Sequence, residues 1–280
     1  MRIKISVDST CDLPREMLDR HDIGVAPLYI VRDGESLRDG EEITADDLYA
    51  HVRTTGQLCS TAAVSYGDYL ERFRAYLAAY DAVVHLTIAA GMSSCWQNAC
   101  MAARKLGERV FVVDSENLSA GIGLLALRAA EMAERDVPAA AVAAELEALK
   151  QRLDVSFIIE TLDFLRRGGR CSAVAALGAN LLRLRPGIEV KNGVMELGKK
   201  YRGAPDKYIP AYIAERLAVC AYDRGRCILM HSGVDPAVEE AAAAQLAGSG
   251  LFDEVLRCRV GCTISNHCGP GALGLVMLRA

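Results

Sequence analysis

Residues 82–114, AVVHLTIAAGMSSCWQNACMAARKLGERVFVVD, contain the pattern that decides the fold of this chain. Two short runs rich in valine, residues 82–88 and 110–113, are typical of buried strands. Between them, apolar side chains recur at three- and four-residue intervals, which predicts an amphipathic helix that begins near Ser94. Two strands joined by a helix form a parallel βαβ unit, so the sequence predicts an α/β protein.

The same alternation extends on both sides of this unit. Residues 3–7 and 25–31 are also β-rich. Residues 65–80 begin with Ser-x-x-Asp and carry aromatic side chains at helical spacing, which predicts a helix with a capping box and its aromatics in the core. Two alanine-rich helices are expected at residues 119–135 and 138–153. The first half of the chain is therefore expected to form a parallel-sheet α/β domain.

The pattern changes after a strand predicted at residues 155–159. A short helix over residues 161–167 should end at a pair of glycines, and Asn192 followed by Gly193 predicts a two-residue hairpin turn. Further strands are expected at residues 188–191, 194–197, 226–231 and 252–265, and helices near residues 207–222 and 236–246. We therefore divide the chain into an N-terminal α/β domain, residues 1–154, and a C-terminal α/β domain, residues 155–280.

The composition excludes several classes of protein. Hydrophobic residues make up 51% of the 280 residues, and 32 Lys and Arg against 36 Asp and Glu give a formal net charge of −4. This balance provides no general attraction to nucleic acid. The chain starts directly with a strand pattern rather than a signal peptide, and its two long uncharged stretches, residues 86–103 and 260–278, are interrupted by Gly, Asn, Gln or Pro. We expect a cytoplasmic protein without a transmembrane segment.

The ten cysteines are scattered through the chain and are expected to be reduced, buried side chains. The best metal-ligand candidates are Cys258, Cys262 and Cys268 beside His267. Their spacing contains no C-x-x-C pair, so we expect no metal site.

Three polar segments, residues 8–12, 87–97 and 114–117, follow predicted strands. Each stands at the carboxyl end of a strand, where the chain turns toward a helix, which is where α/β proteins bind their ligands. In the second segment the chain delivers Ser93 and Ser94 to the start of a helix, where free N–H groups and the helix dipole favour an anion. Simple capping is the alternative role, and the two are compatible: Ser94 could cap the helix while Ser93 binds.

Two further segments carry weaker signals. Thr61 belongs to a polar loop before the predicted helix at residue 65, where a turn explains it equally well. His267 lies in SNHCGPGALGL, residues 265–275, between a predicted strand and a glycine-rich turn. Gly269 and Gly271 could form an anion-binding nest or a purely structural turn. Sequence spacing does not connect Thr61 or His267 to Ser93.

A family resemblance connects them. The chain resembles the DegV family, bacterial lipid-binding proteins that include the fatty-acid-binding subunit of fatty acid kinase. Six motifs, in the family's order along nearly the whole chain, carry the resemblance: DSTCDLP (residues 8–14), CSTAAVS (59–65), TIAAGMSSCWQNA (87–99), VVDSENLSAGIG (112–123), TLDFLRRGGRCS (161–172) and NHCGPGALG (266–274).

The resemblance implies a two-domain fold, with a parallel sheet in the N-terminal domain, a largely antiparallel sheet in the C-terminal domain, and the ligand between them. It implies a protein that is not an enzyme itself but binds a long-chain fatty acid and presents it to a partner kinase, which forms acyl phosphate. The sequence agrees in having no G-x-x-x-x-G-K-[ST] loop and no kinase signature. Expected partners are the fatty acid, a kinase subunit and, transiently, a membrane; no cofactor and no nucleic acid are expected.

The resemblance also assigns residues. Thr61, Ser93 and His267 match the positions that hold the fatty-acid carboxylate. Arg170 and Arg202 match basic residues near the headgroup that meet the acyl phosphate or the kinase, and Gly269 and Gly271 are expected beside them. The chain departs from the family pattern at Ala62, Ala63, Val64, Ala89, Ala90, Ser94 and Cys95, which leaves the pocket wall and the preferred acyl chain open.

Two rival functions stay open at this point. The first is a lipid hydrolase with Ser93 as nucleophile and His267 as base, although the sequence has no G-x-S-x-G elbow. The second is a lipid-sequestering module without a kinase partner.

Overall fold

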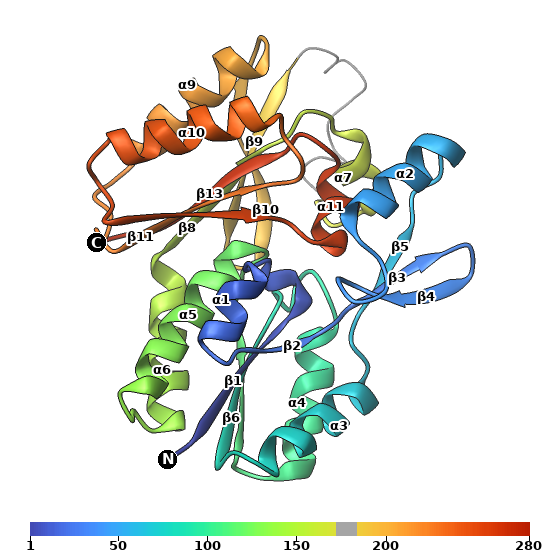
Figure 1. The fold of residues 1–280 in the computed structure, drawn as a ribbon, viewed down its shortest axis with the longest axis vertical. Helices are drawn as coiled ribbons and strands as arrows, with labels where there is room; N and C mark the ends of the chain where they lie inside the picture. Colours follow the sequence, from blue (N-terminus) through green and yellow to red (C-terminus); the bar gives the residue numbers. More distant parts are fainter. Residues whose placement is uncertain (172–183) are drawn as a thin grey trace.

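The computed structural model describes residues 1–171 and 184–280 (Figure 1). In its N-terminal part, a parallel sheet has the strand order β2-β1-β6-β7. Its strands are β1 (Ile3–Asp8), β2 (Gly24–Ala26), β6 (Ala82–Thr87) and β7 (Val110–Asp114). The surrounding helices are α1 (Arg15–Arg20), α3 (Tyr66–Leu77), α4 (Cys95–Leu106), α5 (Ala120–Glu134) and α6 (Ala139–Leu149), with short 3₁₀ turns η1 (Ser9–Cys11) and η2 (Lys150–Arg152). Helices α3 and α4 lie on one side of the sheet, and α5 and α6 on the other (Figure 1).

A second sheet, with the order β10-β9-β8-β13-β11-β12, dominates the C-terminal part. Its strands are β8 (Leu153–Ile158), β9 (Arg185–Lys191), β10 (Val194–Tyr201), β11 (Arg226–His231), β12 (Glu254–Arg259) and β13 (Leu273–Leu278). All neighbouring pairs are antiparallel except β11 and β12. Helices α9 (Pro205–Leu217) and α10 (Pro236–Gly248) cover one face (Figure 1). The expected largely antiparallel sheet is confirmed.

A small antiparallel sheet, β4-β3-β5, projects beside these two sheets (Figure 1). It consists of β3 (Tyr29–Arg32), β4 (Glu35–Arg38) and β5 (Ser60–Ala62), and α2 (Ala45–Thr55) follows β4. Next to it lie the two short helices α7 (Asp163–Gly168) and α11 (Cys262–Cys268), and α11 contacts α2, α7, β3 and β5. We call the small sheet β4-β3-β5 the arm. Its contacts with α11 bring β5 and α11 together.

One hydrophobic core runs between the two large sheets. Buried side chains as far apart in sequence as Val7, Leu125 and Val276 belong to the same cluster. The predicted domain division after residue 154 falls within β8, the first strand of the second sheet. That division stays a prediction.

Local signals predicted several elements correctly. The side chain of Ser65 accepts the N–H of Asp68 and the side chain of Asp68 accepts the N–H of Ser65, which is the predicted capping box of α3. Asn192 and Gly193 both have positive φ, 50° and 76°, as a two-residue hairpin between β9 and β10 requires.

Other predictions were wrong. The strand expected at residues 25–31 is two strands in different sheets, because Pro27 has no N–H to continue the parallel ladder and the chain leaves the sheet there. The strand expected at residues 252–265 ends at Arg259, and α11 follows it. Thr61, expected in a loop, lies in β5 opposite Ile30 of β3. Helices α1 and α2 and strands β4 and β13 have no counterpart among the predicted elements.

Candidate functional site

The polar segments that follow β1, β6 and β7 lie together at one edge of the parallel sheet. The carboxylate of Asp8 accepts the N–H of Ile88 at 3.0 Å, which ties the end of β1 to the segment after β6. The carboxylate of Asp114 accepts the N–H of Ala90 at 3.2 Å, which ties the same segment to the end of β7. These bonds fix the path of residues 88–94 toward α4.

Ser93 lies half-buried at the end of this path, just before α4. Its Oγ accepts the N–H of Cys95 at 3.3 Å and donates to the sulfur of Cys95 at 3.2 Å. Ser94 occupies the N-cap position, but its side chain is exposed and makes no capping hydrogen bond. The expectation that the Ser94 side chain caps the helix is therefore wrong, and Ser93 rather than Ser94 accepts an N–H of the first turn.

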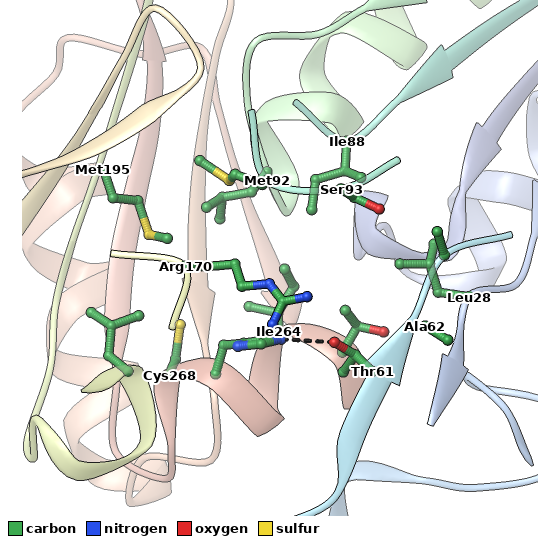
Figure 2. Close-up of a pocket in the computed structure, with 15 residues that line it drawn as sticks. Leu28, Thr61, Ala62, Ile88, Met92, Ser93, Arg170, Met195, Ile264 and Cys268 are labelled. Carbon is green, nitrogen blue, oxygen red and sulfur yellow. Dashed lines mark hydrogen bonds between the residues drawn. The ribbon is translucent and has the colours of Figure 1, made fainter. Parts of the chain in front are cut away.

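The side chains of Thr61 and His267 are in hydrogen-bond contact where β5 of the arm packs against α11. The Oγ1 of Thr61 in β5 lies 3.0 Å from the Nε2 of His267 in the last turn of α11 (Figure 2, dashed line). Both side chains are partly buried. The structure thus joins two residues that sequence spacing could not connect.

Two buried carboxylates hold the N-terminus of α11. Asp39 accepts the N–H groups of Cys262 at 2.9 Å and Thr263 at 3.2 Å, and also the Oγ1 hydroxyl of Thr263 at 2.7 Å. Asp12 accepts the N–H of Gly261 at 2.8 Å and the hydroxyl of Ser119 at 2.6 Å. Burial raises the pKa of Asp12 to about 7, although both hydrogen bonds oppose the shift. The carboxylates place α11 and thereby His267.

His267 is held in its neutral form. Burial, followed by the nearby charge of Arg170, lowers the pKa of His267 to about 4. Its Nδ1 is buried and has no hydrogen-bond partner among the described residues. A Cβ at Gly168 would lie within 3.0 Å of Nδ1, so the glycine backbone fills that side of the ring. A bare nitrogen there costs less than a buried, unpaired N–H, so the geometry favours a proton on Nε2, donated to Thr61.

Thr61, Ser93 and His267 line one cavity of about 550 Å³, which includes its opening to solvent (Figure 2). Most of its other walls are apolar, including Leu28, Ile88, Met92, Leu118, Leu165, Met195 and Ile264. Arg170 is exposed and extends into the cavity from the end of α7, with its Nη1 donating to the Gly168 carbonyl at 3.0 Å. The cavity thus combines hydroxyl donors and one cation with a hydrophobic wall.

Other predicted site residues do not line this cavity. Arg202 is exposed beyond the end of β10, whereas Met195 near its start lines the cavity. The N–H of Gly269 donates to the Ser265 carbonyl, and Gly271 packs against the Glu160 carboxylate, which would repel an anion. The expectation of a glycine nest beside the headgroup is therefore not supported.

The alanines that depart from the family pattern separate into two groups. Ala62 and Ala63 line the cavity. Ala89 is fully buried and Ala90 partly buried, and neither belongs to the cavity wall. Of these four alanines, only Ala62 and Ala63 stand where they can change the shape of the cavity wall.

The cysteine and histidine cluster is not arranged as metal ligands. In residues 1–171 and 184–280, no three His, Cys, Asp or Glu side chains are grouped so as to hold a metal ion. Burial raises the pKa of both Cys258 and Cys268 to about 12, which keeps the thiols neutral. Within the same ranges, no helix has the length and apolar character needed to cross a bilayer.

Sequence reasoning missed Asp12, Asp39 and Gly168, which position His267. Asp12 lies inside a polar segment that was singled out, and Gly168 belongs to the predicted glycine pair. No sequence pattern marked Asp39 as a functional residue, because it follows β4, an edge strand that was itself not predicted.

The comparisons with known proteins bear on the whole chain. A family model described as "Uncharacterised protein, DegV family" matches residues 2–280. The chain belongs to the DegV family. A fatty acid-binding protein of Thermotoga maritima is 31% identical over 283 residues, covering 98% of this chain and 96% of its own. The solved structure of a DegV family protein from Thermus thermophilus, described for its fatty acid binding, matches with a TM-score of 0.90 and 34% identity over both complete chains.

The description of a second solved structure names a lipid. The stearic acid-binding protein of Eubacterium ventriosum has a TM-score of 0.84 and 26% identity, with 99% of this chain and 98% of its own covered. These likenesses confirm the expected two-sheet DegV fold.

The geometry gives the rival hydrolase hypothesis no support. Among the residues that the structure describes, the Ser93 hydroxyl hydrogen-bonds to Cys95, and His267 bonds to Thr61 instead. No carboxylate of the described residues orients Nδ1 of His267, where Gly168 leaves no room. The nucleophile, base and orienting acid of a hydrolase triad are not assembled here.

Proposed function

We propose that this protein binds a long-chain fatty acid by its carboxylate, through Thr61, Ser93 and His267, and presents the headgroup to a partner kinase that converts it to acyl phosphate. One observation carries the proposal. Two hydroxyls and a neutral imidazole meet at one apolar cavity of about 550 Å³. A fatty acid needs both features, because its carboxylate requires hydrogen-bond donors and its acyl chain requires an apolar wall.

The hydroxyl protons are available to a carboxylate. With the proton of the neutral His267 ring on Nε2, the tautomer that the buried Nδ1, unpaired among the described residues, favours, Nε2 donates to Thr61 and the Thr61 hydroxyl keeps its own proton for the ligand. The Ser93 hydroxyl faces a thiol, a weak acceptor, and a carboxylate oxygen would replace it. Both donors would therefore turn toward the ligand, and a buried carboxylate would not be left unpaired.

The apolar wall accounts for the tail. Each methylene removed from water contributes about 0.8 kcal/mol, so an acyl chain gains affinity with every carbon that reaches the wall. Leu28, Ile88 and Met92 come from the N-terminal part, whereas Met195 and Ile264 come from the C-terminal part. The tail would lie between the two large sheets.

Arg170 supplies a positive charge at the mouth. Its exposed guanidinium would attract the carboxylate and would meet the added charge of an acyl phosphate. Arg202 lies outside the cavity, so we assign it only the partner-facing role. ATP chemistry would belong to the kinase, and the exchange would take place in the cytoplasm.

The relatives support the lipid. Members of the same family with known structures are described as fatty acid-binding proteins, one of them as a stearic acid-binding protein. The kinase partner rests on the family resemblance and on the accessible headgroup.

Native mass spectrometry of the protein purified from its own cells tests the first half of the proposal. A bound mass in the fatty-acid range is expected, and it should fall in the Ser93→Ala variant. Repeated preparations that carry no fatty acid and that fail to bind added oleate would refute it.

Incubation with candidate kinase subunits, ATP and oleate tests the second half. Acyl phosphate formation is expected, and formation should fall in Arg170→Ala while oleate still binds. Oleate binding without acyl phosphate with every kinase tried would instead favour the lipid-sequestering module. A fluorophosphonate probe should leave Ser93 unlabelled; stoichiometric labelling would revive the hydrolase.

A further inference from the structure

Asp8, at the end of β1, is a fully buried residue beside the segment that delivers Ser93 to the cavity. Its Oδ2 accepts the N–H of Ile88, at the start of that segment, at 3.0 Å. Its Oδ1 lies 2.5 Å from the hydroxyl of Tyr69 in α3 and 3.2 Å from Nε2 of His85 in β6. Because a carboxylate can only accept hydrogen bonds, the Tyr69 hydroxyl and Nε2 of His85 both donate to Asp8.

The ring of Tyr69 is held by packing as well as by its hydroxyl. Tyr69 and His85 are fully buried. The Tyr69 ring stacks on Phe73 with 5.6 Å between centroids, and it meets the imidazole of His85 edge-on at 5.1 Å. Removal of the Tyr69 hydroxyl would therefore leave the ring in its place, so the contribution of the hydroxyl can be measured by itself.

The Tyr69 hydroxyl also hydrogen-bonds to the thiol of Cys95, the first residue of α4. Burial, followed by the charge of Asp8, raises the pKa of Cys95 to about 12, so the thiol keeps its proton. Tyr69 has one proton and gives it to the carboxylate, which is the stronger acceptor. The S–H of Cys95 is therefore the donor between the thiol and Tyr69.

Cys95 connects this buried group to Ser93. Its sulfur accepts the Ser93 hydroxyl at 3.2 Å, and its N–H donates to the Ser93 oxygen at 3.3 Å. With the S–H of Cys95 directed at Tyr69, the sulfur can only accept from Ser93. The hydrogen bonds thus run in one direction, from the cavity wall to the buried carboxylate. We call Asp8, Tyr69 and Cys95 the relay.

We propose that the relay positions Ser93 for the fatty-acid carboxylate, by holding its hydroxyl as a hydrogen-bond donor at the cavity wall. The proposal rests on the proposed function and deepens it. When a carboxylate arrives, the O–H of Ser93 turns from the sulfur to the ligand, while the N–H of Cys95 still holds the Ser93 oxygen. Asp8 fixes the segment at both ends, directly at Ile88 and through Tyr69 at Cys95.

Infrared spectroscopy of the S–H stretching band tests the direction of the relay in delipidated protein. The band of Cys95 is identified by its loss in Cys95→Ser. We expect Tyr69→Phe to shift this band toward the frequency of a thiol without an acceptor, because the S–H loses the Tyr69 oxygen. An unchanged band in a folded Tyr69→Phe variant would overturn the proposal.

Titration with oleate tests what the relay contributes to binding. Tyr69→Phe and Cys95→Ala should each lower the affinity about three- to tenfold. Cys95→Ser should recover most of the affinity, because its hydroxyl can donate to Tyr69 and accept from Ser93. Tyr212→Phe is the matched control: Tyr212 is 1% exposed, and its hydroxyl hydrogen-bonds to Ser156 at 2.8 Å in the core of the C-terminal part. It should leave both the oleate affinity and the Cys95 band unchanged.

A double-mutant cycle separates positioning from general packing. In the Ser93→Ala background, Tyr69→Phe should cause no further loss of oleate affinity, because its effect passes through the Ser93 hydroxyl. A further loss of the same size as in the unmodified protein would mean that Tyr69 acts by packing alone, which would overturn the proposal.

The outcomes distinguish this proposal from the proposed function. If the unmodified protein binds no oleate, the proposed function fails and this proposal fails with it. If it binds oleate and the folded variants Tyr69→Phe and Cys95→Ala bind it equally well, only the role of the relay fails. If thermal melting shows that Tyr69→Phe does not fold, Cys95→Ala and Cys95→Ser decide, and equal affinities of these two variants would overturn the proposal.

Discussion

The Oγ1 of Thr61 and the Nε2 of His267 lie 206 residues apart in the sequence and 3.0 Å apart in the structure. Thr61 is placed by β5, which pairs with β3 of the arm. His267 is placed by α11, whose N-terminus is held by Asp12 and Asp39 from two other parts of the chain. The candidate site is thus built by tertiary contacts, and each contact can be tested separately.

Removal of either hydroxyl should weaken fatty-acid binding. Ser93→Ala and Thr61→Val are each expected to cost about 1–3 kcal/mol, because a buried carboxylate would lose a hydrogen bond. Isothermal titration with oleate measures the effect. Thr61→Ser should restore most of the affinity, and Ser94→Ala should leave it unchanged, since the Ser94 side chain is exposed and caps nothing. Unchanged affinity in both Ser93→Ala and Thr61→Val would remove these residues from the site.

His267 should remain neutral at physiological pH. Its pKa of about 4 in the folded protein lies below the ordinary value of 6.5. NMR titration of the imidazole signals, assigned with His267→Gln, should show no protonation between about pH 5 and 8, with the proton on Nε2. A midpoint near 6.5 would contradict the burial argument.

The same shift makes His267 a source of acid sensitivity. The unfolded chain takes up a proton at this histidine as pH falls through 6.5, whereas the folded protein does so only near 4. Protonation of His267 therefore leaves the free energy of unfolding unchanged above pH 6.5. As pH falls from 6.5 toward 4, it lowers the free energy of unfolding by up to about 3 kcal/mol. Urea unfolding across this range should show a shallower pH slope in His267→Gln. Equal slopes would mean that other groups account for acid unfolding.

Local sequence predicted the elements that local chemistry determines. The capping box of Ser65 and Asp68 starts α3, and Asn192 with Gly193 turns β9 into β10. Helix α11 was missed, because the carboxylates that accept its first N–H groups lie 249 and 223 residues away along the chain. A seven-residue helix without a capping side chain of its own has too weak a local signal.

The site shows the same limit. The position of Ser93 between a strand and a helix indicated an anion site from sequence alone. Thr61 and His267 were joined to it only by the family resemblance, since no spacing rule spans the distance between β5 and α11. Arg202 was placed near the headgroup by the same resemblance, and the structure leaves it outside the cavity. Which residues of the six motifs meet a ligand is decided by where the fold places their side chains.

Asp39 should be more important for stability than its place beside an edge strand indicates. Its two oxygens accept hydrogen bonds from the Cys262 and Thr263 backbone and from the hydroxyls of Thr263 and Ser9. In Asp39→Asn one oxygen is replaced by an NH₂ group that faces donors, so we expect a loss of at least about 2 kcal/mol in urea unfolding and weaker oleate binding.

Asp46→Asn is the control for Asp39→Asn. Asp46 pairs with Arg259 on the surface, where its side chain is 72% exposed. A surface ion pair contributes at most about 1 kcal/mol, so this variant should unfold nearly as the original protein does. If Asp39→Asn is no more damaging than Asp46→Asn, the buried carboxylate does not hold α11.

Gly168 should fix the position of the His267 ring. The backbone conformation of Gly168 is open to alanine, and alanine is the better helix former, so Gly168→Ala would ordinarily be neutral or stabilising. Here the added Cβ would collide with Nδ1 of His267, and the ring must turn away from Thr61. We expect oleate affinity to fall by about 1–3 kcal/mol, together with a shift of the His267 ring signals in NMR.

Gly248→Ala at the end of α10, where no atom lies within 4 Å of the new Cβ, should leave both the oleate affinity and the ring signals unchanged. Because an alanine at either position has the same helix propensity, a loss found only at residue 168 comes from the collision with His267, whereas equal behaviour of the two variants would show that the ring does not depend on this glycine.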